Sequence, residues 1–99
     1  MRAIKELVRN ISAELDDASA YIDQALKYKD EDRDLAEMYY NLSRGEMEHA
    51  DQEHNQAVRI IKAYTGEVPA AMKAVWDYEH ERMIDDQTKI KVRQALFKS

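Results

Sequence analysis

The chain has 99 residues and a formal net charge of −5, with 44% hydrophobic and 35% charged residues. This length suits one small domain, and the composition is typical of a folded helical protein rather than a disordered one. The absence of cysteine excludes disulfides and thiolate metal sites, and the negative charge argues against nucleic acid as a partner.

The first predicted element is a helix over residues 2–28. Its charged N-terminal segment is neither a secretory signal nor a membrane span, so we expect no membrane partner and a cytoplasmic location. Residues spaced alternately by three and four predict one buried face. That face comprises Ile4, Leu7, Ile11, Glu14, Ala18, Tyr21 or Ile22, Ala25 and Tyr28. Glu14 is the one acid on it.

The charged turn "KDEDRD" separates this helix from a second one, predicted over residues 33–64. Asp30, Asp32 or Asp34 is expected to cap it. The same spacing rule predicts a buried face made of Leu35, Tyr39, Leu42, Glu46, His49, Glu53, Ala57, Ile60 and Tyr64. Gly45 is unfavourable in a helix, and its place beside Glu46 suggests a close approach of another helix.

The segment "TGEVP" ends the second helix, and a third is predicted over residues 69–97. Its expected buried face comprises Met72, Val75, Trp76, Glu79, Met83, Asp86, Ile90 and Phe97. His54 and His80 are expected to be exposed to solvent. The fold class is therefore all-α: residues 1–99 form one domain with a long antiparallel helical hairpin plus a third helix. Its uncovered apolar surface predicts a homodimer or higher homo-oligomer, completing a four-helix-type bundle.

The acids on these faces indicate a metal site. A buried carboxylate needs a basic partner, a proton or a metal, and basic residues are scarce on the predicted faces. Glu46 and His49 are three positions apart, so both side chains reach one point beside the helix. A Glu-x-x-His pair facing a Glu such as Glu14 is the ligand pattern of carboxylate-bridged di-metal sites in helical bundles. These donors suit iron, with manganese or zinc as alternatives.

Three further residues are candidates near this site. Glu53 lies two turns from Glu46 and is interpreted either as a structural acid or as a ligand for a second ion. Glu79 is either an additional metal ligand or a structural polar residue. Tyr21 is expected to hydrogen-bond a ligand carboxylate. Glu14 itself has an alternative role as a polar residue that sets the register of the bundle.

Two stretches, "AELDDASAY" and "LAEMYYNLSRGEMEHA", resemble the first- and second-helix ligand segments of the ferritin-like superfamily. The half-length layout is similar to the encapsulated ferritins. This resemblance implies a di-iron ferroxidase centre shared by two chains, with Glu14, Glu46 and His49 of each as ligands and catalytic residues. It also implies an encapsulin shell as a partner, although no targeting tail is recognisable after Phe97. Arg82 stands where a second Glu-x-x-His would need its histidine.

Two functional hypotheses follow from these patterns. The first is a ferroxidase, an oxidoreductase that converts Fe(II) to Fe(III) at the homodimer interface. The second is a non-catalytic helical assembly protein, for example a phage or accessory factor, which dimerises through the same face. In the second hypothesis the inward acids are hydrated or protonated and bind no metal.

Overall fold

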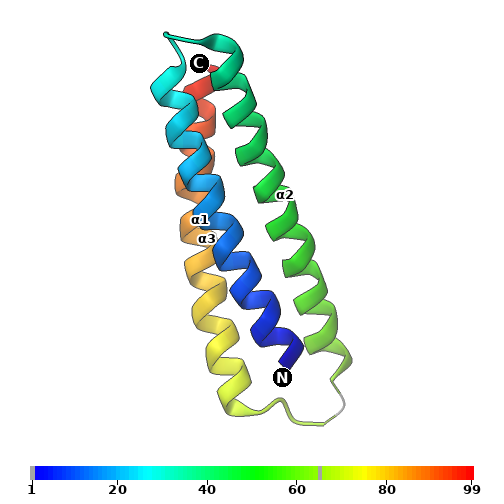
Figure 1. The fold of residues 1–99 in the computed structure, drawn as a ribbon. Helices are drawn as coiled ribbons and strands as arrows, with labels where there is room; N and C mark the ends of the chain where they lie inside the picture. Colours follow the sequence, from blue (N-terminus) through cyan, green and yellow to red (C-terminus); the bar gives the residue numbers. More distant parts are fainter. Residues whose placement is uncertain (1, 65) are drawn as a thin grey trace.

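Three helices form a rod of 55 × 17 × 17 Å in the computed structural model, which describes residues 2–64 and 66–99 (Figure 1). The helices are α1 (Arg2–Tyr28), α2 (Arg33–Ala63) and α3 (Ala70–Lys98). Helix α2 runs antiparallel to α1, and α3 returns alongside α1, so the C-terminus lies at the α1–α2 turn (Figure 1). The all-α prediction is confirmed, and every helix boundary is within one residue of its expected position.

The first turn is stabilised by one of the three acids expected to cap α2. Asp32 is the N-cap, and its carboxylate accepts a hydrogen bond of 3.2 Å from the Leu35 backbone N–H. This bond satisfies one of the backbone donors that a helix start leaves unpaired. At the other end, Gly66 has a φ of 105°, a conformation that glycine adopts without strain.

Small residues at a seven-residue spacing bring α1 and α2 together. Helix α2 buries Ala36, Ser43, Ala50 and Ala57, and α1 buries Ile4, Ile11, Ala18 and Ala25. Short side chains allow close backbone approach, and this pair of helices makes the most extensive contact in the molecule. The one buried hydroxyl in this interface is satisfied, because Ser43 Oγ donates to the Ala18 carbonyl oxygen over 2.8 Å.

The predicted buried face of α2 is wrong by one position. The buried residues are Ala36, Tyr40, Ser43, Met47, Ala50 and Ala57, each adjacent to a residue of the expected stripe except Ala57, which belongs to it. Leu42, expected in the core, is 41% exposed. One position is a rotation of about 100° about the helix axis. Glu46 and His49 therefore lie beside the core rather than in it.

Helix α3 packs mainly against α1, and its backbone makes little contact with α2. Its buried residues are Met72, Met83, Ile90 and Phe97, all on the expected face, whereas Val75 is exposed. Large side chains fill the space between α3 and α2: the rings of Phe97 and Tyr40 stack with centroids 4.8 Å apart. Among the helices of the described residues, none combines the length and the apolar character needed to cross a bilayer.

Candidate metal centre

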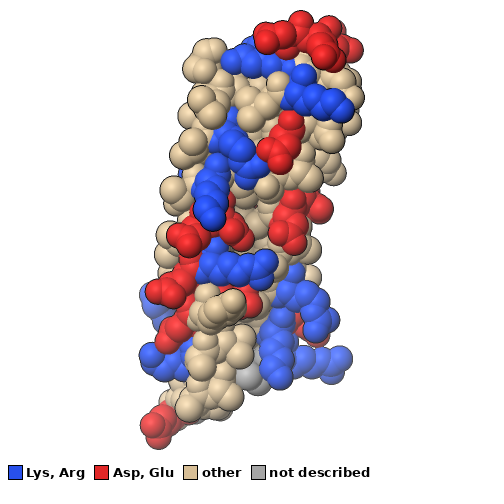
Figure 2. Space-filling model, turned by 90° about the vertical axis from the view of Figure 1, so that its left-hand side faces the viewer, with Lys and Arg blue, Asp and Glu red and all other residues tan. Residues whose placement is uncertain are grey.

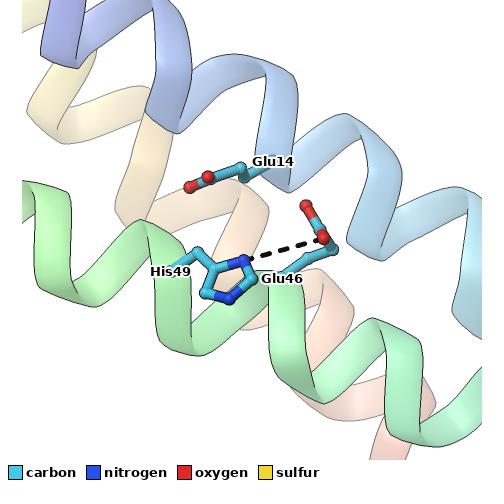
Figure 3. Close-up of side chains that lie close together, drawn as sticks. All are labelled: Glu14, Glu46 and His49. Atoms are coloured by element: carbon cyan, nitrogen blue, oxygen red, sulfur yellow. Dashed lines mark ion pairs between the residues drawn. The ribbon is translucent and has the colours of Figure 1, made fainter.

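Glu14, Glu46 and His49 come together on the outer side of the α1–α2 pair. One possible ligand atom from each lies within 4.8 Å of the other two. Glu14 projects from α1 and the other two from α2, with α3 passing behind them (Figure 3). His49 Nδ1 is 3.7 Å from Glu46 Oε1. The two carboxylates are half-buried, whereas 56% of the His49 side chain is exposed, so the group opens to solvent on one side.

Two levels of structure create this arrangement. The proximity of Glu46 to His49 is local, because positions i and i+3 lie on the same side of a helix. Glu14 joins them through tertiary packing of the α1–α2 pair. The adjacent core cluster contains Leu15 of α1 and Met47 of α2, which are the chain neighbours of Glu14 and Glu46. Burial of those two residues fixes the rotation of both helices and turns the two carboxylates towards one another.

Burial and neighbouring acids raise the pKa of Glu14 to about 7. Loss of hydration is the largest cause; a hydrogen bond to Glu53 and the negative charges of Glu53, Glu46 and Asp17 act in the same direction. Glu14 Oε2 and Glu53 Oε2 are both buried and, among the described residues, have no donor facing them. A proton on Glu14 supplies that donor, and a bound cation would offset the same negative charge.

The three acids of this region have no basic partner. Across residues 2–64 and 66–99, no lysine or arginine lies within ion-pair distance of Glu14, Glu46 or Glu53; the sole ion-pair contact is that of Glu46 with His49. The sequence pattern indicated this scarcity of basic partners for the first two helices. Negative charge at this site is therefore left to protons or to metal ions.

Glu53 and Glu79 lie outside the three-residue group. Glu53 faces Glu14 as described, whereas Glu79 on α3 pairs with Arg82, whose Nη1 is 3.8 Å from Glu79 Oε2. Arg82 also lies 3.8 Å from Asp86, so the expectation that basic residues do little to offset the acids of α3 is wrong. The roles of Glu53 and Glu79 as metal ligands stay predictions.

Tyr21 lies in an aromatic row next to the site. Its ring stacks on Tyr39, with centroids 6.2 Å apart, and Tyr39 stacks in turn on Tyr28. Within the described chain the Tyr21 hydroxyl makes no hydrogen bond to Glu14, Glu46 or His49, so its expected contact with a ligand carboxylate stays a prediction.

Sequence reasoning missed a cluster of three aromatic rings between α2 and α3. His54 and His80, expected in solvent, stack on each other with centroids 5.0 Å apart, and both stack or tilt against Trp76. Burial lowers the pKa of His54, and His80 acts in the same direction while Asp51 opposes it. The four-residue spacing of Trp76 and His80 was the available signal, but the partner on α2 depended on tertiary packing.

Comparisons with known proteins add no relative to this picture: no protein family, no curated protein and no solved structure matches the chain. The likeness to ferritin-like proteins therefore rests on the two ligand segments of the sequence and on the geometry that the fold gives them.

Proposed function

We propose that this protein binds divalent transition-metal ions, iron above all, between α1 and α2 through Glu14, Glu46 and His49. The observation that supports this is their convergence within 4.8 Å in a region whose acids have no lysine or arginine partner among the described residues. Removing this uncompensated charge requires a cation or a proton.

The donor set selects among metals. Two carboxylates and one imidazole, with no thiolate, suit Fe(II), Mn(II) and Zn(II) better than Cu(I). Three protein donors leave coordination positions free for water, substrate or further ligands. The exposed side of His49 faces solvent, which gives ions a route to the site. Carboxylate ligands also stabilise the higher charge of Fe(III) over that of Fe(II).

A second chain would complete the site. Its Glu14, Glu46 and His49 would double the ligand set and bury the open side, giving the di-iron pattern of ferritin-like bundles. Fe(II) is then the substrate: each ion loses one electron to dioxygen or peroxide, and the protein acts as a ferroxidase. In this proposal Glu14, Glu46 and His49 hold the ions, and Tyr21 is placed to hydrogen-bond a ligand carboxylate after a small side-chain movement.

The experiment combines elemental analysis with Fe(II) oxidation under air. We expect bound metal in the purified protein and a ferric absorbance on adding Fe(II), both lost in the double variant Glu46→Ala with His49→Ala. Glu48→Ala is the matched control, because it removes an exposed acid between the two ligands. Oxidation that proceeds equally in the double variant and the wild type would exclude the ferroxidase.

One observation favours a second candidate, the non-catalytic assembly protein. The raised pKa of Glu14 allows it to be protonated near neutral pH and to donate a hydrogen bond to Glu53, which needs no metal. The two candidates differ in thermal melts. Metal that binds only the folded state raises the melting temperature, whereas a metal-free scaffold responds to acid alone.

A further inference from the structure

The outward face of α3 is unusually apolar for a surface helix. Among the described residues, α1 has no large exposed hydrophobic side chain, whereas α3 has Val75, Tyr78, Ile84, Val92 and Leu96. Tyr78 is 67% exposed, Val92 57% and Leu96 53%. Apolar residues are thus spread around α3 instead of gathering on its inward face, as they do on α1 and α2. A helix of this kind normally has a partner on both sides.

Six exposed residues form a continuous line along this face, which we call the α3 outer stripe: Tyr78, Arg82, Asp85, Lys89, Val92 and Leu96. Their spacing alternates four and three, the repeat by which one helix packs along another. Apolar side chains occupy the ends of the stripe and charged ones the middle. Positive and negative side chains also alternate over the neighbouring face formed by α1 and α3 (Figure 2).

The charge order identifies the partner and its direction. In a parallel pair of α3 helices, Asp85 would face its own copy, and like charges in contact oppose association. In an antiparallel pair, Asp85 can lie opposite Lys89 of the second copy, and the two-fold axis repeats this contact. The same register places Tyr78 opposite Leu96 and lays the aliphatic part of Arg82 over Val92. The stripe is therefore complementary to itself when reversed.

The ion pairs within the chain favour this register over the neighbouring one, in which Asp85 would face Arg82. Arg82 already contacts Glu79 and Asp86 of its own helix. Within the part of the chain that the structure describes, Asp85 and Lys89 make no ion pair. Their charges are thus available to another molecule.

We propose that the α3 outer stripe is a self-association surface on which a second copy of this chain packs antiparallel, with reciprocal Asp85–Lys89 ion pairs. This surface lies on a different helix from the ligands of the candidate metal centre. An assembly that used both would extend beyond a dimer.

The test is a charge exchange, followed by sedimentation in a concentration series with a chelator present, so that metal-bridged contacts do not contribute. We expect a dimer for the wild type. Asp85→Lys and Lys89→Glu should each raise the dissociation constant at least about tenfold, because both place like charges opposite each other twice per dimer. Lys91→Glu is the matched control, since it makes the same charge change at an exposed position beside the stripe.

An equal mixture of the two single variants gives the sharpest result. One then carries only lysines at positions 85 and 89 and the other only acids, so the mixed dimer should form while neither variant pairs with itself. Helicity measured by circular dichroism verifies that each variant is folded. A monomeric wild type throughout the series, variants that dimerise as well as the wild type, or a mixture that stays monomeric would each overturn the proposal.

Discussion

Two acidic regions of this rod differ in how their charge is balanced. Between α1 and α3, Arg82 contacts Glu79 and Asp86, and Arg93 Nη1 lies 2.6 Å from Asp23 Oδ1. Between α1 and α2, Glu14, Glu46 and Glu53 have no arginine or lysine among the described residues, and the pKa of Glu14 is raised. Similar side chains thus serve different ends: paired acids hold helices together, whereas unpaired acids are available to a cation.

The largest expected effect is metal-dependent stabilisation of the α1–α2 region. An ion at a hundred times its dissociation constant should raise the free energy of unfolding by about 2.7 kcal/mol, provided it binds only the folded protein. Glu46→Ala with His49→Ala should abolish this increase, and Arg82→Ala should leave it intact. Denaturant titrations with and without Mn(II) or Zn(II) measure it. Equal stabilisation of the double variant would show that the ion binds elsewhere.

The next effect is the pH dependence of the metal-free protein. The folded pKa of Glu14, about 7, lies above its ordinary value of 4.5, so its contribution is most favourable below pH 4.5 and is lost as the pH rises through 7. Glu14→Gln should remove this loss, so the variant should be the more stable protein at pH 8 than the wild type without metal. His54, whose pKa is lowered, acts in the opposite sense in both proteins and cancels in their difference.

Thermal melts of the wild type and Glu14→Gln between pH 4 and 8 measure this difference. Glu79→Gln is the control, because Glu79 is paired with Arg82 and belongs to the balanced region. A difference between wild type and Glu14→Gln that does not change with pH would contradict the raised pKa of Glu14.

Gly45→Ala tests whether the region beside Glu46 is open. A Cβ at this position would meet no atom within 4 Å, so the expected close helix approach is absent from the described chain. Replacing a mid-helix glycine by alanine should then raise the free energy of unfolding by about 1 kcal/mol. If a second chain packs tightly here, the same variant will instead weaken association. Melts at low and high protein concentration separate the two effects.

The smallest effect is expected in the balanced region. Arg82→Ala should lower the free energy of unfolding by about 0.2–1 kcal/mol, because its ion pairs are partly exposed and 3.8 Å long. The loss should shrink in high salt and should not depend on added metal. A larger loss that metal ions reverse would erase the distinction between the two regions.

Part of the candidate site was predictable because it is local. The turns "KDEDRD" and "TGEVP" set the helix boundaries, and the i, i+3 spacing sets Glu46 beside His49. The nearness of Glu14 also followed from two antiparallel helices joined by a short turn. The ion pairs of Arg82 and the stacking of His54 on His80 and Trp76 were not predictable, since each depends on how the third helix is rotated.

The sequence by itself determined three long helices, their ends and which residues share a side of each. Only the tertiary structure decided which side of α2 faces inward, because helical periodicity specifies spacing but not absolute rotation. Prediction favoured the large residues Leu35, Tyr39 and Leu42, whereas close packing selected Ala36, Ser43 and Ala50, whose small side chains let two backbones approach. That rotation of one residue keeps Glu46 and His49 at the rim of the interface, where an ion can reach them.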